Sequence, residues 1–283
     1  MTEFDSFAVV DWSSGKDTGP TPRKDAVWAA AVLAGVEQEP IYFRNRILAV
    51  EWLSVLIASE CKARRRLMVG FDFPFGYPSG FAECVTGSPD PLTIWAYYHE
   101  HLVDTPQGNN RFALASKLNR LFPGVGPFWF KPAKADAPHL PLKGRARHGH
   151  GMKERRRAED RARGAFSCWQ MGGAGAVGGQ VMTGMAALET LRRIFPNDIA
   201  VWPFQLDQKP VHFVEIWPTL IDPVVKASPD DIRDRAQVRF LVRALANLRP
   251  ARLAEMMAVE APEEGWILGL GFEADLQEAA CLT

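Results

Sequence analysis

The sequence predicts an α/β protein in which strands come first and then alternate with helices. Short apolar runs typical of strands occupy residues 7–12, 26–33 and 40–43, separated by turns rich in Gly and Pro. The apolar spacing then takes the helical period over residues 47–63, and a further strand is indicated at residues 67–72. This change of period, followed by another buried strand, favours a mixed sheet covered by helices.

The rest of the chain is predicted to hold a less regular middle part and then a return to regular elements. Residues 123–141 are rich in Pro, Gly and aromatic residues and are expected to form loops. Ser228 and Pro229 followed by two aspartates predict the start of an amphipathic helix at Asp230. The expected helices are 91–103, 111–122, 152–166, 181–195, 230–248, a short one at 253–259 and a terminal piece, and the expected strands are 199–204 and 211–217.

Length and composition place this chain among ordinary globular proteins. It has 283 residues, with 33 basic and 33 acidic side chains. We expect a single domain over residues 1–283, with a helical and loop insertion at about 78–197. No apolar run approaches the roughly 20 residues of a membrane span, and the first residues lack the apolar core of a signal peptide. The four cysteines are scattered, so we expect free thiols, a cytoplasmic location and no membrane partner.

The neutral total hides a basic segment. Residues 143–163 contain nine Lys or Arg and three Asp or Glu. Such an excess can bind phosphate groups, and Lys153 and residues 155–157 are candidate contacts, as is Arg111 from an earlier helix. The alternative is a solvated helix face on which the acids partner the bases.

Two aspartates mark a candidate site. Asp11 ends the first predicted strand, and Asp72 ends the fourth, and each is followed by a turn broken by Gly or Pro. A carboxylate at the end of a buried strand is costly unless a charged or hydrogen-bonding partner meets it. Two such groups predict one shared polar site at an edge of the sheet, where a divalent cation would offset their repulsion.

Further motifs at the strand ends resemble the DUF429 family, which is predicted to have a ribonuclease-H-like fold and a possible nuclease activity. The resemblance lies in Val10-Asp11, in the run from Phe71 to Gly76, in residues 214–219 and in residues 264–267, in the same order along the chain. Asp72-Phe73-Pro74 departs from the commoner Asp-Ala-Pro form. The resemblance implies three antiparallel strands, then strands alternating with helices, and a large helical insertion.

The resemblance also implies a set of site residues. Asp11 would be the carboxylate of the first strand, Asp72 that of the fourth, Glu215 that of the fifth, and Asp234 that of the closing helix. Such a cluster would hold Mg²⁺ or Mn²⁺ and hydrolyse a phosphodiester in nucleic acid or a nucleotide. Structural alternatives remain open: Asp11 as a turn cap, Asp72 as a brace for its own turn, Glu215 paired with an arginine, and Asp234 as a first-turn helix acid.

Three other functions are compatible with the sequence. The turn Ser13-Ser14-Gly15-Lys16 is similar to the phosphate-binding turn of actin-like ATPases and sugar kinases, and the Gly-rich run 172–179 could serve as a phosphate loop or a hinge. The His pairs 99/101 and 148/150 could chelate a transition metal, although no third ligand is in register. A protein that binds a nucleotide or a partner without turnover is the remaining alternative.

Overall fold

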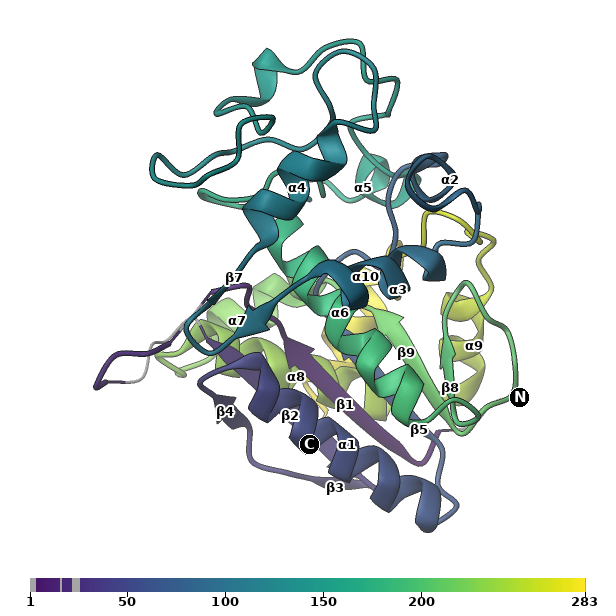
Figure 1. Ribbon diagram of the computed structural model, residues 1–283. Helices are drawn as coiled ribbons and strands as arrows, with labels where there is room; N and C mark the ends of the chain where they lie inside the picture. The colour runs from purple at the N-terminus through teal and green to yellow at the C-terminus, as the bar shows by residue number, and fades with distance from the viewer. Residues whose placement is uncertain (1–3, 16, 22–25, 283) are drawn as a thin grey trace. The chain divides into compact units, whose positions relative to one another are not determined.

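The structure is a computed structural model that describes residues 4–15, 17–21 and 26–282 (Figure 1). The chain forms two compact units. Unit 1 comprises Met1–Asp72, Leu191–Glu260 and Ile267–Thr283, and unit 2 comprises Phe73–Thr190 and Ala261–Trp266.

Unit 1 is built on a mixed sheet, which has seven strands within the described residues. The spatial order is β3-β2-β1-β5-β9-β8, with β4 pairing beside β3 on β2. β1 pairs antiparallel with β2 and parallel with β5, and β5, β9 and β8 are mutually parallel. The strands are β1 (Ser6–Asp11), β2 (Val27–Leu33), β3 (Val36–Glu37), β4 (Ile41–Phe43), β5 (Leu67–Phe71), β8 (Ile199–Val201) and β9 (Val211–Glu215).

The predicted α/β class with a mixed sheet is confirmed. The central strands β1, β5 and β9 are almost wholly buried, as their continuous apolar runs require. Parallel strands need long crossover connections, and here the helix α1 (Arg46–Lys62) joins β4 to β5. Asn45 caps α1 by accepting a hydrogen bond from the Leu48 amide at 3.1 Å.

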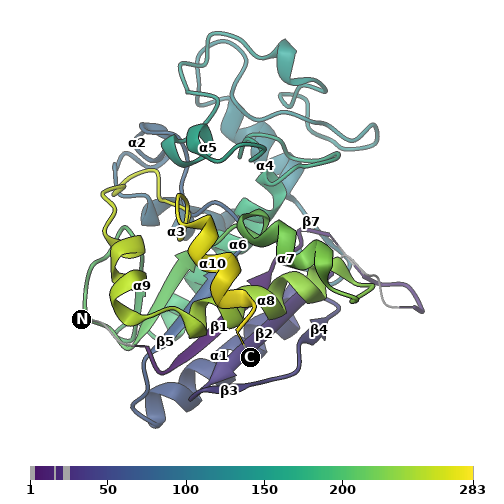
Figure 2. The ribbon, with the colours of Figure 1, turned by 180° about the vertical axis from the view of Figure 1, so that it is seen from behind.

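Helices cover both faces of this sheet. α8 (Arg233–Asn247) packs on β1 and β2, and α10 (Glu273–Ala280) packs on α8, which Figure 2 shows from behind. α1 covers the opposite face, where Glu60 accepts a hydrogen bond of 2.6 Å from Ser6 of β1. The remaining elements of unit 1 are η2 (Pro218–Ile221), α7 (Asp222–Ala227) and α9 (Pro250–Met257).

Unit 2 consists of helices and long loops around an aromatic core. Tyr77 stacks on Trp169 with 5.1 Å between ring centroids, and Phe81 and Phe128 meet Trp169 edge-on. The elements are α2 (Phe81–Thr86), α3 (Leu92–His101), the hairpin β6 (Asp104–Thr105) and β7 (Gly108–Asn109), α4 (Arg111–Asn119), η1 (Gly144–Ala146), α5 (Arg157–Arg161) and most of α6 (Gly178–Ile194).

A late segment of the chain is fixed into unit 2 by a buried carboxylate. Glu264 accepts hydrogen bonds from the amide and hydroxyl of Ser79, both at 3.0 Å, and from the amide of Arg157 at 2.7 Å. The backbone carbonyl of Glu264 also accepts a hydrogen bond from Arg156, which is fully buried. The motif at residues 264–267 therefore holds distant chain segments together.

Two predicted elements differ from the structure. The charged helix expected at 152–166 is reduced to the five residues of α5, because Arg156 turns inward to pair with Glu159 and Glu264 and its neighbours follow an irregular path. The helix expected from Asp230 starts at Arg233, since Ser228 and Asp230 accept hydrogen bonds in the preceding turn instead of capping the helix. Among the described helices, none combines the length and the apolar character needed to span a bilayer.

Candidate active site

A pair of aspartates lies at the carboxyl ends of two adjacent parallel strands of unit 1. Asp11 is the last residue of β1, and Asp72 directly follows β5. The register pairs Val10 with Phe71, so Asp11 and Asp72 are the next residues on their strands and face the same side of the sheet. Both residues are half-buried. The sheet thus brings together the two carboxylates that the sequence predicted to share one edge.

The two carboxyl groups are hydrogen-bonded to each other. Burial, followed by the charge of Asp72, raises the pKa of Asp11 well above its usual value. Burial also raises the pKa of Asp72 to about 6, against the opposing effect of hydrogen bonds from Asp11 and from the Trp12 amide. The amide of Trp12 donates to Oδ1 of Asp72 at 2.6 Å. The pair therefore retains a proton at pH values where ordinary aspartates are fully ionised.

A third carboxylate approaches the pair from α8. The negative charge of Asp234, in the first turn of this helix, raises the pKa of both Asp11 and Asp72. Its neighbour Arg233 acts in the opposite sense on Asp11. Asp230, which the sequence predicted as the start of this helix, is instead bound by Arg235 at 2.7 Å. Of the acids near the start of α8, Asp234 is thus the one with a demonstrable effect on the pair.

Glu215 lies on the other face of the sheet. The register pairs Glu215 of β9 with Phe71 of β5, one residue before Asp72. Successive residues of a strand point to opposite faces, so the side chain of Glu215 faces away from the side that carries Asp72. The following residue, Ile216, shares the face of Gly70, where a Cβ atom on the glycine would lie 2.8 Å from Cγ2 of Ile216. The structure does not bring Glu215 to the aspartate pair.

A buried arginine binds the backbone of the turn that follows β1. Arg46, the first residue of α1, donates from Nη1 to the carbonyl oxygens of Ser13 at 2.8 Å and Gly15 at 2.6 Å. The amide of Gly15 donates to Oγ of Ser13 at 3.1 Å. The sequence did not single out Arg46, because an arginine in the first turn of a helix carries no sign of its distant partner. Ser14 is half-buried in this turn, and Lys16 lies outside the described residues.

The other predicted phosphate contacts belong to unit 2. Arg111 begins α4, donates to Oδ1 of Asn109 at 2.7 Å and lies over the ring of Phe112. The Gly-rich run has a packing explanation: the ring of Phe130 lies against Gly172, and the ring of Phe166 lies against Gly175. A Cβ atom at Gly175 would be 2.2 Å from the ring of Phe166, and the φ of this glycine, 73°, lies in the left-handed region that favours glycine.

The histidine pairs make other contacts. His99 lies within hydrogen-bond distance of Thr190 Oγ1 at 3.2 Å, and His101 stacks on Tyr97. His150 meets the Met152 amide at 3.1 Å. Across the described part of the chain, no group of three or more His, Cys, Asp or Glu side chains is close enough to hold a metal ion. The aspartate pair offers two adjoining carboxylates, and Asp234 acts on them through its charge.

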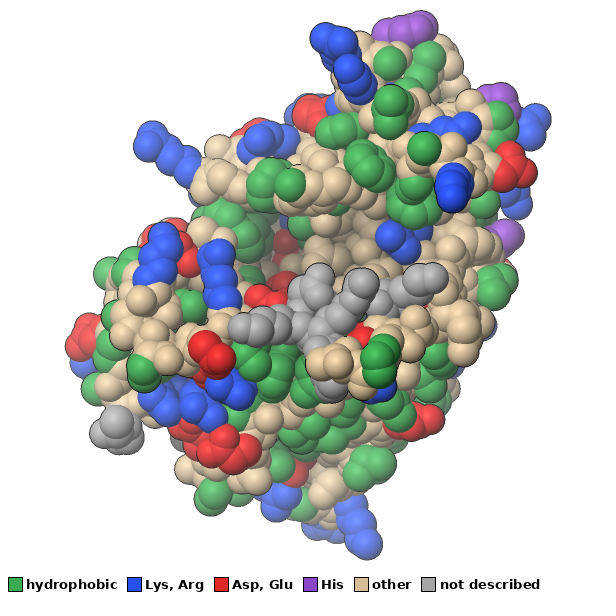
Figure 3. All heavy atoms as spheres, turned by 90° about the vertical axis from the view of Figure 1, so that its left-hand side faces the viewer, with side chains coloured by type: hydrophobic (Ala, Val, Ile, Leu, Met, Phe, Trp, Pro, Cys, Tyr) green, Lys and Arg blue, Asp and Glu red, His purple; other side chains and the backbone are tan. Residues whose placement is uncertain are grey.

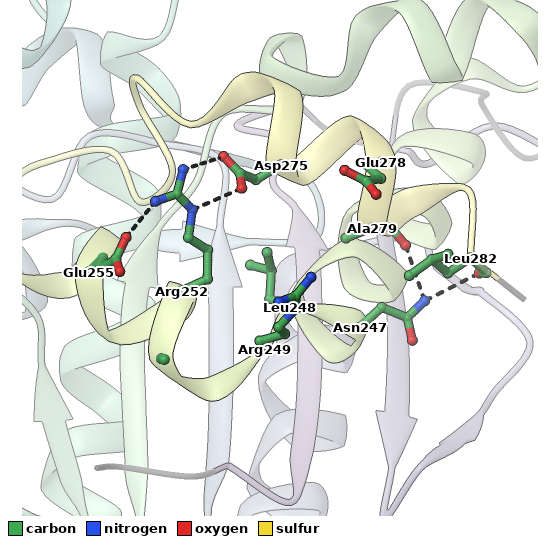
Figure 4. A pocket seen from close by; sticks show the side chains of 10 residues that line it. Asn247, Leu248, Arg249, Arg252, Glu255, Asp275, Glu278, Ala279 and Leu282 are labelled. Atoms are coloured by element: carbon green, nitrogen blue, oxygen red, sulfur yellow. Dashed lines mark hydrogen bonds and ion pairs between the residues drawn. The ribbon is translucent and has the colours of Figure 1, made fainter.

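A separate pocket of about 360 Å³ lies near the end of the chain in unit 1 (Figure 4). Its charged lining is largely paired internally, since Arg252 binds Asp275 through two contacts of 2.8 Å and also meets Glu255. Asn247 donates to the carbonyl oxygens of Ala279 and Leu282. Arg252 joins α9 to α10, Asn247 joins the end of α8 to α10, and none of the predicted site residues lines the pocket.

Comparison of the chain with protein-family models, with curated proteins and with solved structures gave no match. The geometry of the site is therefore the basis for any functional assignment.

Proposed function

We propose that this protein is a divalent-metal-dependent hydrolase of phosphodiesters, acting on nucleic acid or a nucleotide, with Asp11 and Asp72 as its central metal ligands. The observation that carries this proposal is the contact between these two carboxyl groups at the ends of adjacent parallel strands. Ligands and substrates in open α/β sheets bind outside the carboxyl ends of the strands.

The donor set fits a hard cation. Carboxylate oxygens are the ligands that Mg²⁺ and Mn²⁺ prefer, and neither a thiolate nor an imidazole touches the pair among the contacts of the described residues. Two carboxyl groups this close retain a proton because their negative charges repel each other. A divalent cation can displace that proton and neutralise the charges in its place. Asp234 adds negative potential from the start of α8. A divalent cation held here would activate a water molecule and stabilise a leaving oxygen.

The protein's own groups orient this pair. The Trp12 amide fixes Oδ1 of Asp72 at 2.6 Å, and the fully buried Trp12 ring anchors the backbone that carries this amide. Arg46 holds the following turn by its carbonyl oxygens. The carboxylates are thus mounted on rigid strand ends, which preorganises them for a ligand.

The sheet supports a ribonuclease-H-like fold for unit 1. Three consecutive antiparallel strands, β1, β2 and β3, are followed by the parallel strands β5 and β9, and α8 closes the unit on the face of Asp11. This is the arrangement that the resemblance to the DUF429 family implies. Fold alone does not fix the activity, so the proposal depends on the aspartate pair.

Calorimetric titration of Mn²⁺ into the metal-free protein tests the proposal. We expect saturable binding in the wild type and its loss in Asp11→Asn. Glu215→Gln is the matched control, because this carboxylate faces the other side of the sheet, and it should bind Mn²⁺ like the wild type. Mn²⁺-dependent cleavage of bis(p-nitrophenyl) phosphate and of labelled oligonucleotides would follow. Absence of Mn²⁺ binding in the wild type, or its loss in Glu215→Gln with the fold intact, would overturn this assignment.

A further inference from the structure

We propose that the exposed basic side chains of residues 143–163 in unit 2 form a docking surface for the phosphate backbone of single-stranded nucleic acid. This inference rests on the proposed function, because it names the class of substrate. Every residue of unit 2, including the whole of residues 143–163, belongs to the described part of the chain.

The acidic residues of the segment are largely neutralised within it. Glu159 is buried and binds the fully buried Arg156 at 2.7 Å. Glu154 binds Arg147 at 2.8 Å. Of the three acids, only Asp160 remains as an exposed carboxylate without one of these pairings. These two ion pairs neutralise two basic and two acidic side chains. Seven basic side chains and one acidic side chain of the segment remain outside these pairs.

The remaining basic side chains face solvent. On the face shown in Figure 3, Lys and Arg side chains project from several points of unit 2. Within unit 2, four of the seven exposed bases make no side-chain hydrogen bond or ion pair: Lys143, Arg145, Lys153 and Arg163. Arg155, Arg157 and Arg161 are the other three. Unpaired cations on a neutral protein produce a local positive potential, which attracts a polyanion.

Backbone contacts bring the separate parts of this segment together. The hydroxyl of Ser167 donates to the carbonyl of Glu154 at 2.9 Å, and Nε1 of Trp169 donates to the carbonyl of Lys153 at 2.9 Å. Arg147, which binds Glu154, also donates to the carbonyl of Pro127 at 2.7 Å. These bonds fix the backbone beneath Arg145, Lys153 and Arg163, so the cations are presented from a rigid support.

An exposed aromatic ring adjoins the basic side chains and favours a single strand over a duplex. Phe166 is 51% exposed and lies three residues after Arg163. The tip of its ring lies against Gly175. The next residue, Ser167, donates to the carbonyl of Glu154, so Phe166 adjoins the part of the chain that carries Lys153 and Arg155. Unpaired bases stack on such rings, whereas the bases of a duplex are already stacked on each other.

The experiment is fluorescence anisotropy with a labelled single-stranded DNA oligonucleotide, in EDTA, over a series of NaCl concentrations. The test variant is the triple substitution Arg145→Glu, Lys153→Glu and Arg163→Glu, at exposed side chains that form no hydrogen bond or ion pair with the described residues. The matched control carries the same charge change in unit 1, at Lys62, Arg64 and Arg249, which are also exposed and form no ion pair with the described residues.

We expect the wild type to bind with an affinity that falls steeply with salt. The test variant should bind at least about tenfold more weakly and show a shallower slope, because fewer counterions are released, while the control stays within about twofold of the wild type. Phe166→Ala should weaken binding about tenfold without changing the slope, because it removes stacking and no charge.

Three results would overturn the inference. They are an equal loss in the control variant, tighter binding of a duplex of the same sequence, and equally tight binding of vesicles containing phosphatidylserine. The measurement contains no metal, so it separates this inference from the proposed hydrolase. Strand binding without Mn²⁺ binding would refute only the hydrolase, and the reverse result would refute only the docking surface.

Discussion

The carboxyl groups of Asp11 and Asp72 are hydrogen-bonded to each other at the ends of two adjacent parallel strands. The pKa of both groups is raised by burial, and that of Asp11 is raised further by the charge of its partner. At neutral pH, ionising these carboxyl groups therefore costs more free energy in the folded protein than in the unfolded chain. Sites of this kind reduce stability in return for function.

Substitution Asp72→Asn should stabilise the metal-free protein. Asn keeps an oxygen that accepts from the Trp12 amide and removes the repelling charge. A pKa raised to about 6 corresponds to a gain of at most about 3 kcal/mol at pH 8. The gain should shrink to about 0.5 kcal/mol near pH 4, since the wild-type group is then protonated in the folded state and about half ionised in the unfolded state. Urea unfolding in EDTA at both pH values measures this difference.

The control for this prediction is Asp230→Asn. Arg235 holds the pKa of Asp230 below its usual value, so its removal should destabilise the protein at pH 8. If the two variants changed the free energy of unfolding in the same direction, the electrostatic account of the aspartate pair would be wrong.

A buried histidine should make the protein sensitive to acid. His212 of β9 is 4% exposed, and Phe4 packs edge-on against its ring. Burial, followed by the charge of Arg66, lowers the pKa of His212 to about 4. The unfolded chain binds this proton near pH 6.5, so stability is complete above that pH and decreases as the pH falls toward 4.

Between pH 7 and pH 5 this residue should account for a loss of about 2 kcal/mol. Over part of this range, protonation of the aspartate pair stabilises the folded protein as the pH falls. The pH dependence of the wild-type unfolding free energy therefore does not isolate the effect of His212. The measurement is therefore the difference in unfolding free energy between the wild type and His212→Leu at both pH values. A difference that is independent of pH would show that His212 titrates normally.

The part of the site that could be predicted from the sequence is the part determined by where strands end. Asp11 and Asp72 each follow a buried apolar run, and parallel neighbours place such residues at one edge. Asp234 was named only through the resemblance, and the helix that carries it begins three residues later than expected.

The position of Glu215 could not be predicted in this way. A shift of one residue in register moves a side chain to the other face of a sheet, and an apolar run does not specify which register it adopts. The same limit applies to Arg46, whose partners are carbonyl groups more than 30 residues away. The helix predicted at residues 152–166 was wrong for a different reason. The charge pattern of these residues resembles a helix surface, yet Arg156 is buried in unit 2.

The carboxylate of Glu264 should be essential to the stability of unit 2. Although burial alone raises its pKa, the donors from Arg157 and Ser79 hold that pKa below its usual value. Glu264→Ala leaves these buried donors without an acceptor, which should cost on the order of 3 kcal/mol. Glu264→Gln keeps one acceptor oxygen and should cost about half as much. Urea unfolding measures both, with the exposed Glu83→Ala of α2 as a control within about 0.5 kcal/mol of the wild type.

Gly184 of α6 should resist replacement even by alanine. Within a helix, alanine is favoured over glycine by about 1 kcal/mol. Here, however, a Cβ atom would lie 2.2 Å from the ring of Phe73, so the ring must move within a packed core. We expect Gly184→Ala to lower the free energy of unfolding by about 2 kcal/mol.

A double-mutant cycle with Phe73→Leu separates steric conflict from other causes. The smaller side chain leaves room for the new methyl group, so the double variant should be more stable than the sum of the two single effects by at least about 1 kcal/mol. Strict additivity would mean that the ring of Phe73 does not limit this position. Because Phe73 directly follows Asp72, the same cycle run with Mn²⁺ titration asks whether packing in unit 2 affects the geometry of the aspartate pair.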